Sequence, residues 1–233
     1  MRLDKFLSEA NLGTRSQVKD LIRRGVVTVN GVPVKSADSK VDEEADTVCV
    51  RGQPVRYRKF FYYMLNKPPG IVSATRDKLS ATVIELLRPE HRRFDLFPAG
   101  RLDKDTEGFL LLTNDGELAH RLLSPKKHVD KTYRVSIDHG LSGEDVQRLE
   151  QGVDIGEDCL TLPAKVQQME ENVILLTIQE GKFHQVKRML MAVDNSVTAL
   201  KRISFGGIAL DNKLKPGEYR ELTEDEVKIL YGT

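Results

Sequence analysis

Nine residues near the middle of the chain place acidic and basic side chains between two apolar segments. Their sequence is Gly-Arg-Leu-Asp-Lys-Asp-Thr-Glu-Gly at positions 100–108. An ionised carboxylate such as Asp103 can act as a nucleophile or accept a proton. Asp103 and Asp105 would suit a hydrolase with paired carboxylates, but side chains two residues apart point to opposite sides of an extended segment. The pattern also fits a polar loop with a purely structural role.

A carboxylate in a buried site needs a neighbouring cation, because burial raises its pKa and removes its charge. Two adjacent candidates, Lys187 and Arg188, follow Phe-His-Gln-Val at positions 183–186. If a helix begins here, their side chains point about 100° apart, so only one of them can face Asp103. His184 in the same segment is expected to be a structural hydrogen-bonding residue rather than an acid or a base.

The sequence predicts no metal site, because the two cysteines lie far apart and the five histidines include no pair four residues apart. Cys49 and Cys159 are expected to be reduced, buried thiols. No apolar run approaches the ~20 residues of a membrane span. The N-terminus lacks an apolar segment behind its positive charges, so it does not resemble a secretory signal. We expect a soluble cytoplasmic protein that is a monomer and has no membrane partner.

The first fifty residues have the pattern of a small α/β module. Apolar residues at helical spacing predict one helix over residues 3–10, ended by Asn11-Leu12-Gly13, and a second helix capped by Thr14 or Ser16. The Asn30-Gly31 pair between two valine-rich segments predicts a β-hairpin. Another strand is expected around residues 48–50. The basic stretch Arg51–Lys59 that follows is predicted to be a linker.

The net charge of +1 hides a segregation of charge within this module. Residues 1–35 carry seven basic and three acidic residues, and residues 36–50 carry one basic and five acidic residues. Arg15, Lys19 and Arg23 are spaced four apart, so they form a row on one face of the second helix. Such a row can be a solvated face or a surface for a polyanion.

From Phe60 onward the pattern changes to apolar segments separated by polar loops. An apolar run from Phe60 predicts a strand that stops at Asn-Lys-Pro-Pro-Gly, residues 66–70. Residues 82–87 suit a short helix, and a capping box at residues 223–226 predicts a last helix. Further strands are expected at residues 109–113, 134–137 and 173–178, with a turn at Asn114-Asp115-Gly116.

Three phrases in the first module resemble the small RNA-binding module named from ribosomal protein S4. They are Arg-Leu-Asp-Lys-Phe-Leu at 2–7, Thr-Arg-Ser at 14–16 and Arg-Gly-Val-Val-Thr-Val-Asn-Gly at 24–31. The combined spacing is specific, although each residue alone is not. The resemblance implies that this module binds RNA and that its basic residues contact phosphates. The residues concerned are Arg2, Arg15, Lys19 and Arg23.

The segment 100–116 resembles the active-site motif of the pseudouridine synthases, especially the RsuA branch that modifies 16S ribosomal RNA. Phe109 replaces the leucine of that branch. Lys-Thr-Tyr at 131–133 and Glu-Gly-Lys-Phe-His-Gln-Val-Lys-Arg-Met at 180–189 resemble two further motifs of the family. Residues 65–70, 206–208 and 216–220 also match, so the resemblance spans nearly the whole chain.

The resemblance implies that the protein isomerises a uridine in RNA to pseudouridine without a cofactor. Asp103 would be the nucleophile, although attack on the ribose, attack on the base and removal of a ribose proton all remain open. Tyr133 would stack on the uracil, and Lys187 would be the cation beside Asp103, with Arg188 as the next candidate. Arg101 would fill the space left by a flipped base or bind a phosphate.

We therefore expect an α+β protein with two domains: an S4-type RNA-binding module and linker at residues 1–58, and a mixed, largely antiparallel-sheet catalytic domain at residues 59–233. The expected partner is 16S ribosomal RNA, free or in a partly assembled small subunit, with uridine 516 as the target. Two alternatives remain. One is a synthase acting on 23S ribosomal RNA, and the other is a non-catalytic RNA-binding ribosome assembly factor.

Overall fold

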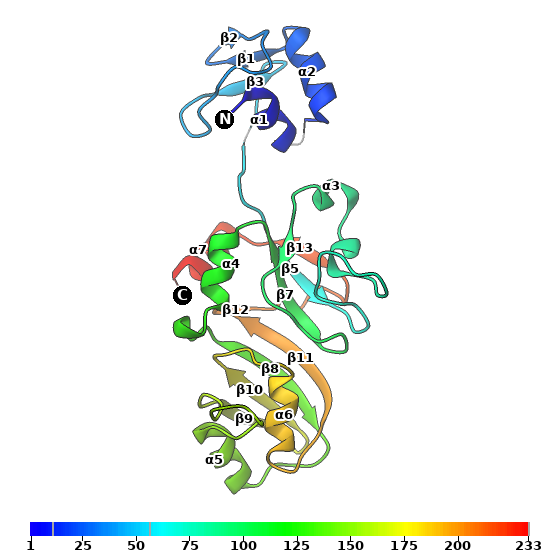
Figure 1. The fold of residues 1–233 in the computed structure, drawn as a ribbon, viewed down its shortest axis with the longest axis vertical. Coiled ribbons are helices and arrows are strands. Elements are labelled where there is room, and N and C mark those ends of the chain that lie inside the picture. Colours follow the sequence, from blue (N-terminus) through cyan, green and yellow to red (C-terminus); the bar gives the residue numbers. More distant parts are fainter. Residues whose placement is uncertain (11, 56, 233) are drawn as a thin grey trace. The chain divides into compact units, whose positions relative to one another are not determined.

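The computed structural model describes residues 1–10, 12–55 and 57–232. The chain divides into two compact units, Met1–Phe60 and Phe61–Thr233, each with its own core (Figure 1). Asn11, expected at the end of the first helix, and Arg56, within the predicted linker, lie outside the described residues. Across the described residues, none of the helices has the length and apolar character needed to span a bilayer.

The N-terminal unit packs two helices against a small antiparallel sheet. The helices are α1 (Leu3–Glu9) and α2 (Arg15–Arg23), and the strand order is β2-β1-β3-β4. Thr14 caps α2, because its hydroxyl accepts from the Gln17 amide at 3.3 Å while the Gln17 side chain accepts from the Thr14 amide at 2.8 Å. This capping box confirms one of the two cap candidates. The strands are β1 (Val27–Val29), β2 (Val32–Pro33), β3 (Val48–Val50) and β4 (Gln53–Pro54).

The prediction that Arg51–Lys59 is a linker is wrong in its first half. Arg51 and Gly52 both have positive φ and form a tight turn, after which β4 pairs antiparallel with β3. The Tyr57 ring stacks on Phe6 with centroids 5.2 Å apart, and its hydroxyl donates to Glu9 at 2.9 Å. A two-residue strand containing a proline carries no alternation pattern, so the sequence could not show that this stretch is folded.

The second unit, which contains the expected catalytic domain and is called the catalytic unit below, is built on a nine-stranded sheet with the order β13-β5-β7-β11-β8-β10-β9. Strands β6 and β12 pair with β7 and β11 at its sides. The mixed, mainly antiparallel sheet confirms the predicted fold class. Its strands are β5 (Tyr62–Lys67), β6 (Phe97–Pro98), β7 (Glu107–Thr113), β8 (Lys131–Ile137), β9 (Lys165–Glu170), β10 (Val173–Ile178), β11 (Val197–Phe205), β12 (Ile208–Ala209) and β13 (Tyr219–Glu221).

One parallel junction joins the two halves of this sheet. Among the described strands of the sheet every pairing is antiparallel except that of β7 with β11, which meet at Lys201↔Glu107 and Arg202↔Gly108. A Cβ added to Gly108 would lie 2.2 Å from the Arg202 carbonyl oxygen. Gly108, the last residue of the polar segment, is therefore required by the close approach of the two strands.

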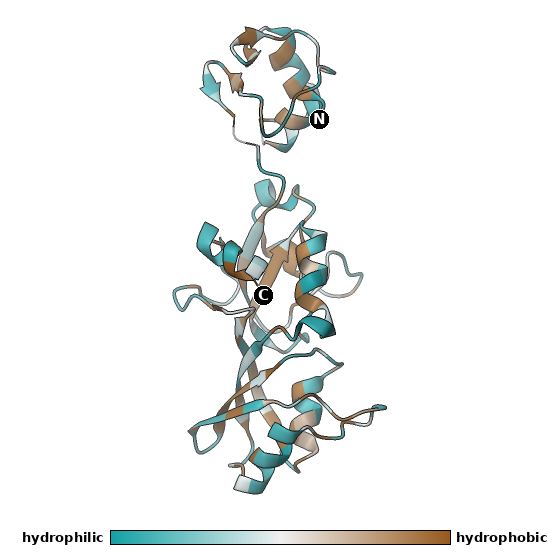
Figure 2. Ribbon diagram, turned by 90° about the vertical axis from the view of Figure 1, so that its left-hand side faces the viewer, coloured by the Kyte–Doolittle hydropathy of each residue, from teal (hydrophilic) through white to brown (hydrophobic). Residues whose placement is uncertain are grey.

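Helices and 3₁₀ turns cover the sheet and connect its strands. They are a 3₁₀ turn at Val83–Leu86, α3 (Pro89–Arg92), α4 (Gly116–Leu123), a 3₁₀ turn at Pro125–Lys127, α5 (Gly143–Gln151), α6 (Gln185–Met191) and α7 (Glu224–Gly232). Figure 2 shows hydrophobic residues gathered on the central strands and both colours on the helices, as expected for amphipathic helices packed on a sheet.

Three local expectations differ from the structure. Asp115, expected to be a turn residue, also caps α4, because its carboxylate accepts a hydrogen bond from the Leu118 amide at 3.0 Å. The short helix expected at residues 82–87 is a 3₁₀ turn. The two cysteines are free but not buried: Cys49 is half-buried and Cys159 is exposed. The predicted capping box at residues 223–226 is confirmed by the paired hydrogen bonds of Thr223 and Glu226.

Candidate active site

The loop that carries Asp103 is held in place by a buried lysine. Lys67 is the last residue of β5 and is fully buried. Its ammonium group donates to the backbone carbonyls of Asp103 at 3.0 Å, Lys104 at 3.2 Å and Thr106 at 2.8 Å, and to that of Pro68 at 3.2 Å. Three of these four bonds fix successive parts of the loop between β6 and β7. Lys67 therefore sets the path of the backbone that presents Asp103.

Burial lowers the pKa of the Lys67 ammonium to about 8, against the opposing negative charges of Asp105, Asp103 and Glu107. No sequence motif discussed above identifies the role of this residue. The available signal was a lysine at the end of an apolar strand and directly before two prolines, a position where a solvated side chain is not expected.

Three further hydrogen bonds hold the loop. The Ser73 hydroxyl donates to the Leu102 carbonyl at 2.9 Å and accepts from the Leu102 amide at 3.0 Å. The Gly70 amide donates to the Lys104 carbonyl at 2.7 Å. The segment 67–73 thus acts as a template for the Asp103 loop. Preorganisation of this kind keeps a reacting group in position before the substrate arrives.

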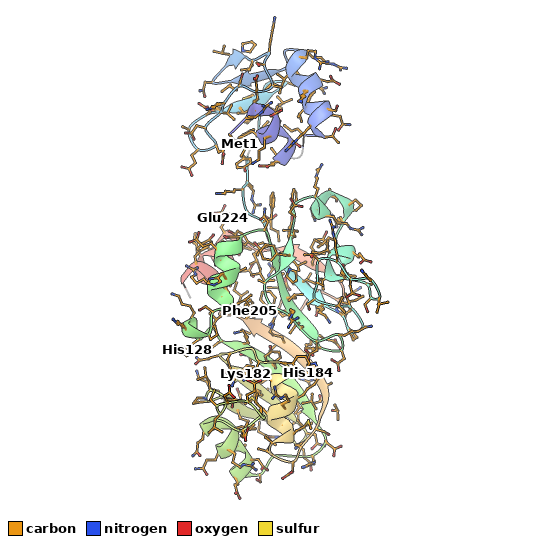
Figure 3. The ribbon with its side chains drawn as sticks, in the orientation of Figure 1. Met1, His128, Lys182, His184, Phe205 and Glu224 are labelled. Carbon is orange, nitrogen blue, oxygen red and sulfur yellow. The ribbon has the colours of Figure 1, made fainter. Side chains whose placement is uncertain are left out.

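The Asp103 carboxylate lies between two basic side chains at the beginning of α6. Lys187 Nζ is 3.6 Å from one carboxylate oxygen, and His184 Nε2 is 3.7 Å from the other. The Asp103 side chain is 29% exposed, so the group is accessible but partly shielded from water. His184 and Lys182 lie at the start of α6, beside the middle of the sheet (Figure 3).

The closest partner of Lys187 is Asp105 and not Asp103. Lys187 Nζ lies 2.8 Å from both carboxylate oxygens of Asp105, and this hydrogen bond lowers the pKa of Asp105. From the sequence, Asp105 is expected to be a loop residue outside the reaction, and no partner is predicted for it. A cation shared by two carboxylates could not be inferred from their spacing, because Lys187 is 82 residues away from Asp105.

Arg188, the second candidate for the cation, points elsewhere. Its guanidinium bonds to Glu157 at 2.8 Å, to the Phe183 carbonyl at 3.0 Å and to the Ile155 carbonyl. The side chains of these two adjacent residues of α6 therefore contact different parts of the unit, as expected for neighbours about 100° apart on a helix. Of the two, Lys187 is the one near Asp103.

Tyr133 and Arg101 line the same pocket as Asp103. Tyr133 lies on β8 and is 7% exposed, whereas Arg101 is exposed on the loop two residues before Asp103. Thr106, Lys182, His184 and Gln185 complete the polar lining, with Ile178 and Leu200 among the apolar residues. A small pocket with one flat aromatic wall and a half-buried carboxylate can hold a planar polar ring. Within the described residues, no three His, Cys, Asp or Glu side chains gather as metal ligands.

The basic residues predicted to bind RNA are exposed in the N-terminal unit. Arg15, Lys19 and Arg23 lie along α2 with exposed side chains, and Arg23 is paired with Asp20 at 3.0 Å. Arg2 differs from them, because its guanidinium forms two hydrogen bonds with Asp4, at 3.0 and 3.1 Å. This contact lowers the pKa of the buried Asp4 carboxyl. Arg2 is therefore tied to a buried carboxylate of its own unit.

Comparison with known proteins gives a family match in each of the two units. The family described as RNA pseudouridylate synthase matches residues 61–192, and the S4 domain matches residues 1–48. An uncharacterized RNA pseudouridine synthase of Bacillus subtilis is 54% identical, over 99% of this chain and 98% of the relative. The ribosomal small subunit pseudouridine synthase A of Vibrio cholerae is 44% identical over 99% of this chain and 100% of the relative.

A further relative and a solved structure extend this result. The ribosomal small subunit pseudouridine synthase A of Escherichia coli is 42% identical over 97% of this chain and 98% of the relative. A crystal structure of a pseudouridylate synthase matches with a TM-score of 0.71 and 38% identity, covering 99% of both chains. The matches extend over both units, so they are not limited to one motif. The chain belongs to the RNA pseudouridine synthases of the RsuA type and carries an N-terminal S4 domain.

Proposed function

We propose that the protein converts one uridine of 16S ribosomal RNA, uridine 516, to pseudouridine and that Asp103 is the nucleophile. The observation that carries the proposal is the position of Asp103, a half-buried carboxylate beside Lys187 in a pocket walled by Tyr133. Relatives named ribosomal small subunit pseudouridine synthase A share 42–44% identity over nearly the full chain, which supports the small-subunit RNA as substrate.

The reaction exchanges one bond of the base for another without a net change in composition. The bond between N1 of the uracil and C1′ of the ribose breaks, and C5 of the same base then bonds to C1′. C5 loses its proton, and N1 gains one, so no electrons or groups enter or leave. The protein must therefore supply a nucleophile or base, a way to hold the detached uracil, and stabilisation of charge.

The residues of the pocket suit these tasks. Asp103 can attack C1′ or the base, or take a proton from the ribose, and each route needs its ionised form. Lys187 Nζ, 3.6 Å away, places a positive charge beside the carboxylate. The Tyr133 ring offers a flat surface for the uracil during its rotation. Arg101, exposed at the edge of the pocket, can bind a phosphate or occupy the space that the flipped nucleotide leaves.

The N-terminal unit supplies affinity in this proposal. The exposed row of Arg15, Lys19 and Arg23 would bind phosphates of the RNA. Phosphate contacts of this kind do not read the base sequence. Selection of the uridine then depends on the catalytic unit and on the fold of the RNA. An RNA substrate of this kind would place the activity in the cytoplasm.

The test is to incubate the purified protein with three RNA substrates and to map pseudouridine at nucleotide resolution. The substrates are free 16S ribosomal RNA, a partly assembled small subunit and 23S ribosomal RNA. We expect one modified position, uridine 516, in either of the first two substrates and none in the third. Modification of 23S ribosomal RNA alone would refute the proposed target. Modification by the Asp103→Asn variant would refute the proposed nucleophile.

A further inference from the structure

An exposed aromatic ring lies directly beside the candidate active site and has no part in the mechanism above. Phe183 is 68% exposed, although it is a large apolar residue in a well-packed protein. One face of its ring stacks on the His184 imidazole, with centroids 3.8 Å apart and planes 19° apart. His184 in turn reaches to 3.7 Å from Asp103. Phe183, His184 and Asp103 thus form a series that leads outward from the carboxylate.

The backbone that carries the ring is held by several bonds. The Phe183 carbonyl accepts from Arg188 at 3.0 Å, and Glu157 holds Arg188 at 2.8 Å. Lys182, just before Phe183, is paired with the same Glu157 at 3.5 Å. His184 has a positive φ of 48° and stands at the N-terminal end of α6. The ring is therefore presented by an ordered segment, and little conformational entropy would be lost when a ligand binds to it.

The face of the Phe183 ring that does not stack on His184 suits one kind of ligand. An exposed phenyl ring offers no hydrogen bond, so it can select only an apolar or aromatic surface. Single-stranded RNA beside a flipped uridine presents unstacked bases, and bases stack on aromatic side chains. Arg101, exposed at the edge of the pocket, adds positive charge for the phosphates of the same strand.

We propose that Phe183 binds a nucleobase that flanks the target uridine, by stacking on the ring face opposite His184. The inference rests on the proposed function, because it assumes an RNA substrate with its reacting uridine at Asp103. It adds a second base-binding position outside the pocket and makes Phe183 a residue that positions the substrate. The stacked base replaces the neighbour that the flanking nucleotide loses when the uridine flips.

The competing explanation is that Phe183 only keeps the His184 ring in place. Both explanations predict a loss of activity when the ring is removed, so activity alone does not separate them. The two explanations differ in what they predict for RNA that lacks the flanking base. If Phe183 stacks on that base, removing the ring no longer lowers activity on this RNA; if Phe183 only positions His184, activity still falls. The experiment therefore combines protein variants with RNA fragments that carry an abasic nucleotide on the 5′ or the 3′ side of the uridine.

Three variants give the kinetic test. Phe183→Leu keeps an apolar side chain without a ring and should lower kcat/KM about tenfold, mainly through KM, in line with about 1–3 kcal/mol per stacked base. Phe183→Tyr should stay within about twofold of the native protein. Met191→Ala, at a side chain that is also 67% exposed on α6, is the matched control and should have no effect. With an abasic nucleotide at one flanking position, native protein and Phe183→Leu should become equally active.

A second measurement does not depend on turnover. The chain contains no tryptophan, so Phe183→Trp introduces a single fluorescent reporter. In an Asp103→Asn background, a 16S or 23S ribosomal RNA fragment should quench this tryptophan, and the matching abasic fragment should not. Met191→Trp in the same background should give no quenching.

The outcomes separate the two proposals. If the native protein modifies no 16S fragment, the proposed target fails, while the quenching experiment still decides the role of Phe183. If Phe183→Leu loses the same factor on intact and on both abasic RNAs, the residue only positions His184 and the inference is overturned. The inference is also overturned if Phe183→Leu is fully active, or if Phe183→Trp is quenched equally by intact and abasic RNA.

Discussion

The two units of this protein use their cations in opposite ways. On α2, Arg15, Lys19 and Arg23 extend into solvent, and only Arg23 has a carboxylate partner at close range among the described contacts. In the catalytic unit, Lys67 is fully buried and bonded to four carbonyls, and Lys187 lies between two carboxylates. The first set can be exchanged for other cations at small cost, whereas the second set depends on exact atom positions.

This contrast shows how one nearly neutral chain can combine two kinds of recognition. Exposed cations contribute affinity through the release of counterions, which depends on their number and on salt. Buried cations contribute geometry, because a misplaced ammonium group leaves carbonyls and carboxylates without a partner. Changes in the two regions should therefore differ in kind as well as in size.

The largest expected effect comes from Asp103→Asn. The amide keeps the size of the side chain but has neither the charge nor the nucleophilicity, so pseudouridine formation should fall by at least about 10³-fold. RNA affinity should stay within about threefold, because it depends on the exposed cations. Single-turnover assays and filter binding measure the two quantities.

The control for this variant is Asp105→Asn, which removes a carboxylate from the same loop. Lys187 then loses the negative charge of its 2.8 Å partner, although the amide oxygen can still accept a hydrogen bond, and it remains 3.6 Å from Asp103. Substantial turnover should remain. A loss of activity equal to that of Asp103→Asn would show that the Lys187–Asp105 pair is part of the reacting group, and the assignment of the nucleophile would have to change.

The second effect is on stability. Lys67→Met keeps the length of the side chain but leaves the Thr106 carbonyl without its donor, whereas the Asp103 and Lys104 carbonyls keep the amides of Thr106 and Gly70. We expect a loss of about 1–3 kcal/mol in the free energy of unfolding, which is the cost of one unsatisfied buried acceptor. Urea unfolding measures this quantity. A variant as stable as the native protein, with native activity, would mean that the loop is held by Ser73 and Gly70 alone.

The third effect concerns the α2 row. Changing Arg15, Lys19 and Arg23 to glutamine should leave stability within about 0.5 kcal/mol, because the side chains are exposed. RNA affinity should fall, and the slope of log K against log salt should decrease by roughly 2–3, about 0.7–0.9 for each phosphate that is no longer neutralised. Binding assays over a range of salt concentrations measure the slope. An unchanged slope would place the row away from the RNA.

The fourth effect is a pH dependence of stability caused by two buried lysines. Burial lowers the pKa values of Lys67 and Lys131 to about 8, below the ordinary value of 10.5. Between these two pH values the unfolded chain holds protons that the folded chain has released, so stability should rise with pH, by about 1–2 kcal/mol per lysine from pH 7.5 to 9.5. The raised pKa values of Tyr57 and Tyr62 oppose this rise only above about pH 10.

Lys131→Met isolates one of the two contributions. Lys131 is 7% exposed and donates to the Val129 carbonyl at 2.9 Å. The variant should retain about half of the native pH dependence between about pH 7.5 and 9.5, as measured by urea unfolding at each pH. A pH dependence identical to that of the native protein would show that Lys131 stays protonated in the folded state.

The sequence predicted well those features that arise from local patterns. The bounds of β10 agree with the apolar run Val173–Ile178, and Thr14, one of the two predicted cap candidates, caps α2. Local patterns failed where a partner lies far away in the chain. Tyr57 packs on Phe6 and bonds to Glu9, about fifty residues earlier in the chain, and Asp115, expected in a turn, caps α4.

The candidate site was predicted in part for the same reason. A motif identifies Asp103, Tyr133 and Lys187 as residues, and all three lie around one pocket or its carboxylate. The motif does not give the contacts between them. The Lys187–Asp105 bond and the four bonds of Lys67 depend on segments that are distant in the sequence, so only the folded chain reveals them.

The parallel junction of β7 and β11 has a consequence for the order in which activity appears during folding. Asp103 precedes β7 in one half of the sheet, whereas Tyr133 on β8 and Lys187 on α6 belong to the other half. The strands of the two halves pair where residues 107 and 108 face 201 and 202, which are distant along the chain. Contacts between such distant segments form late, because closing a long loop is entropically costly. We expect neither half to isomerise uridine alone, so that the onset of activity during refolding coincides with the joining of the two halves.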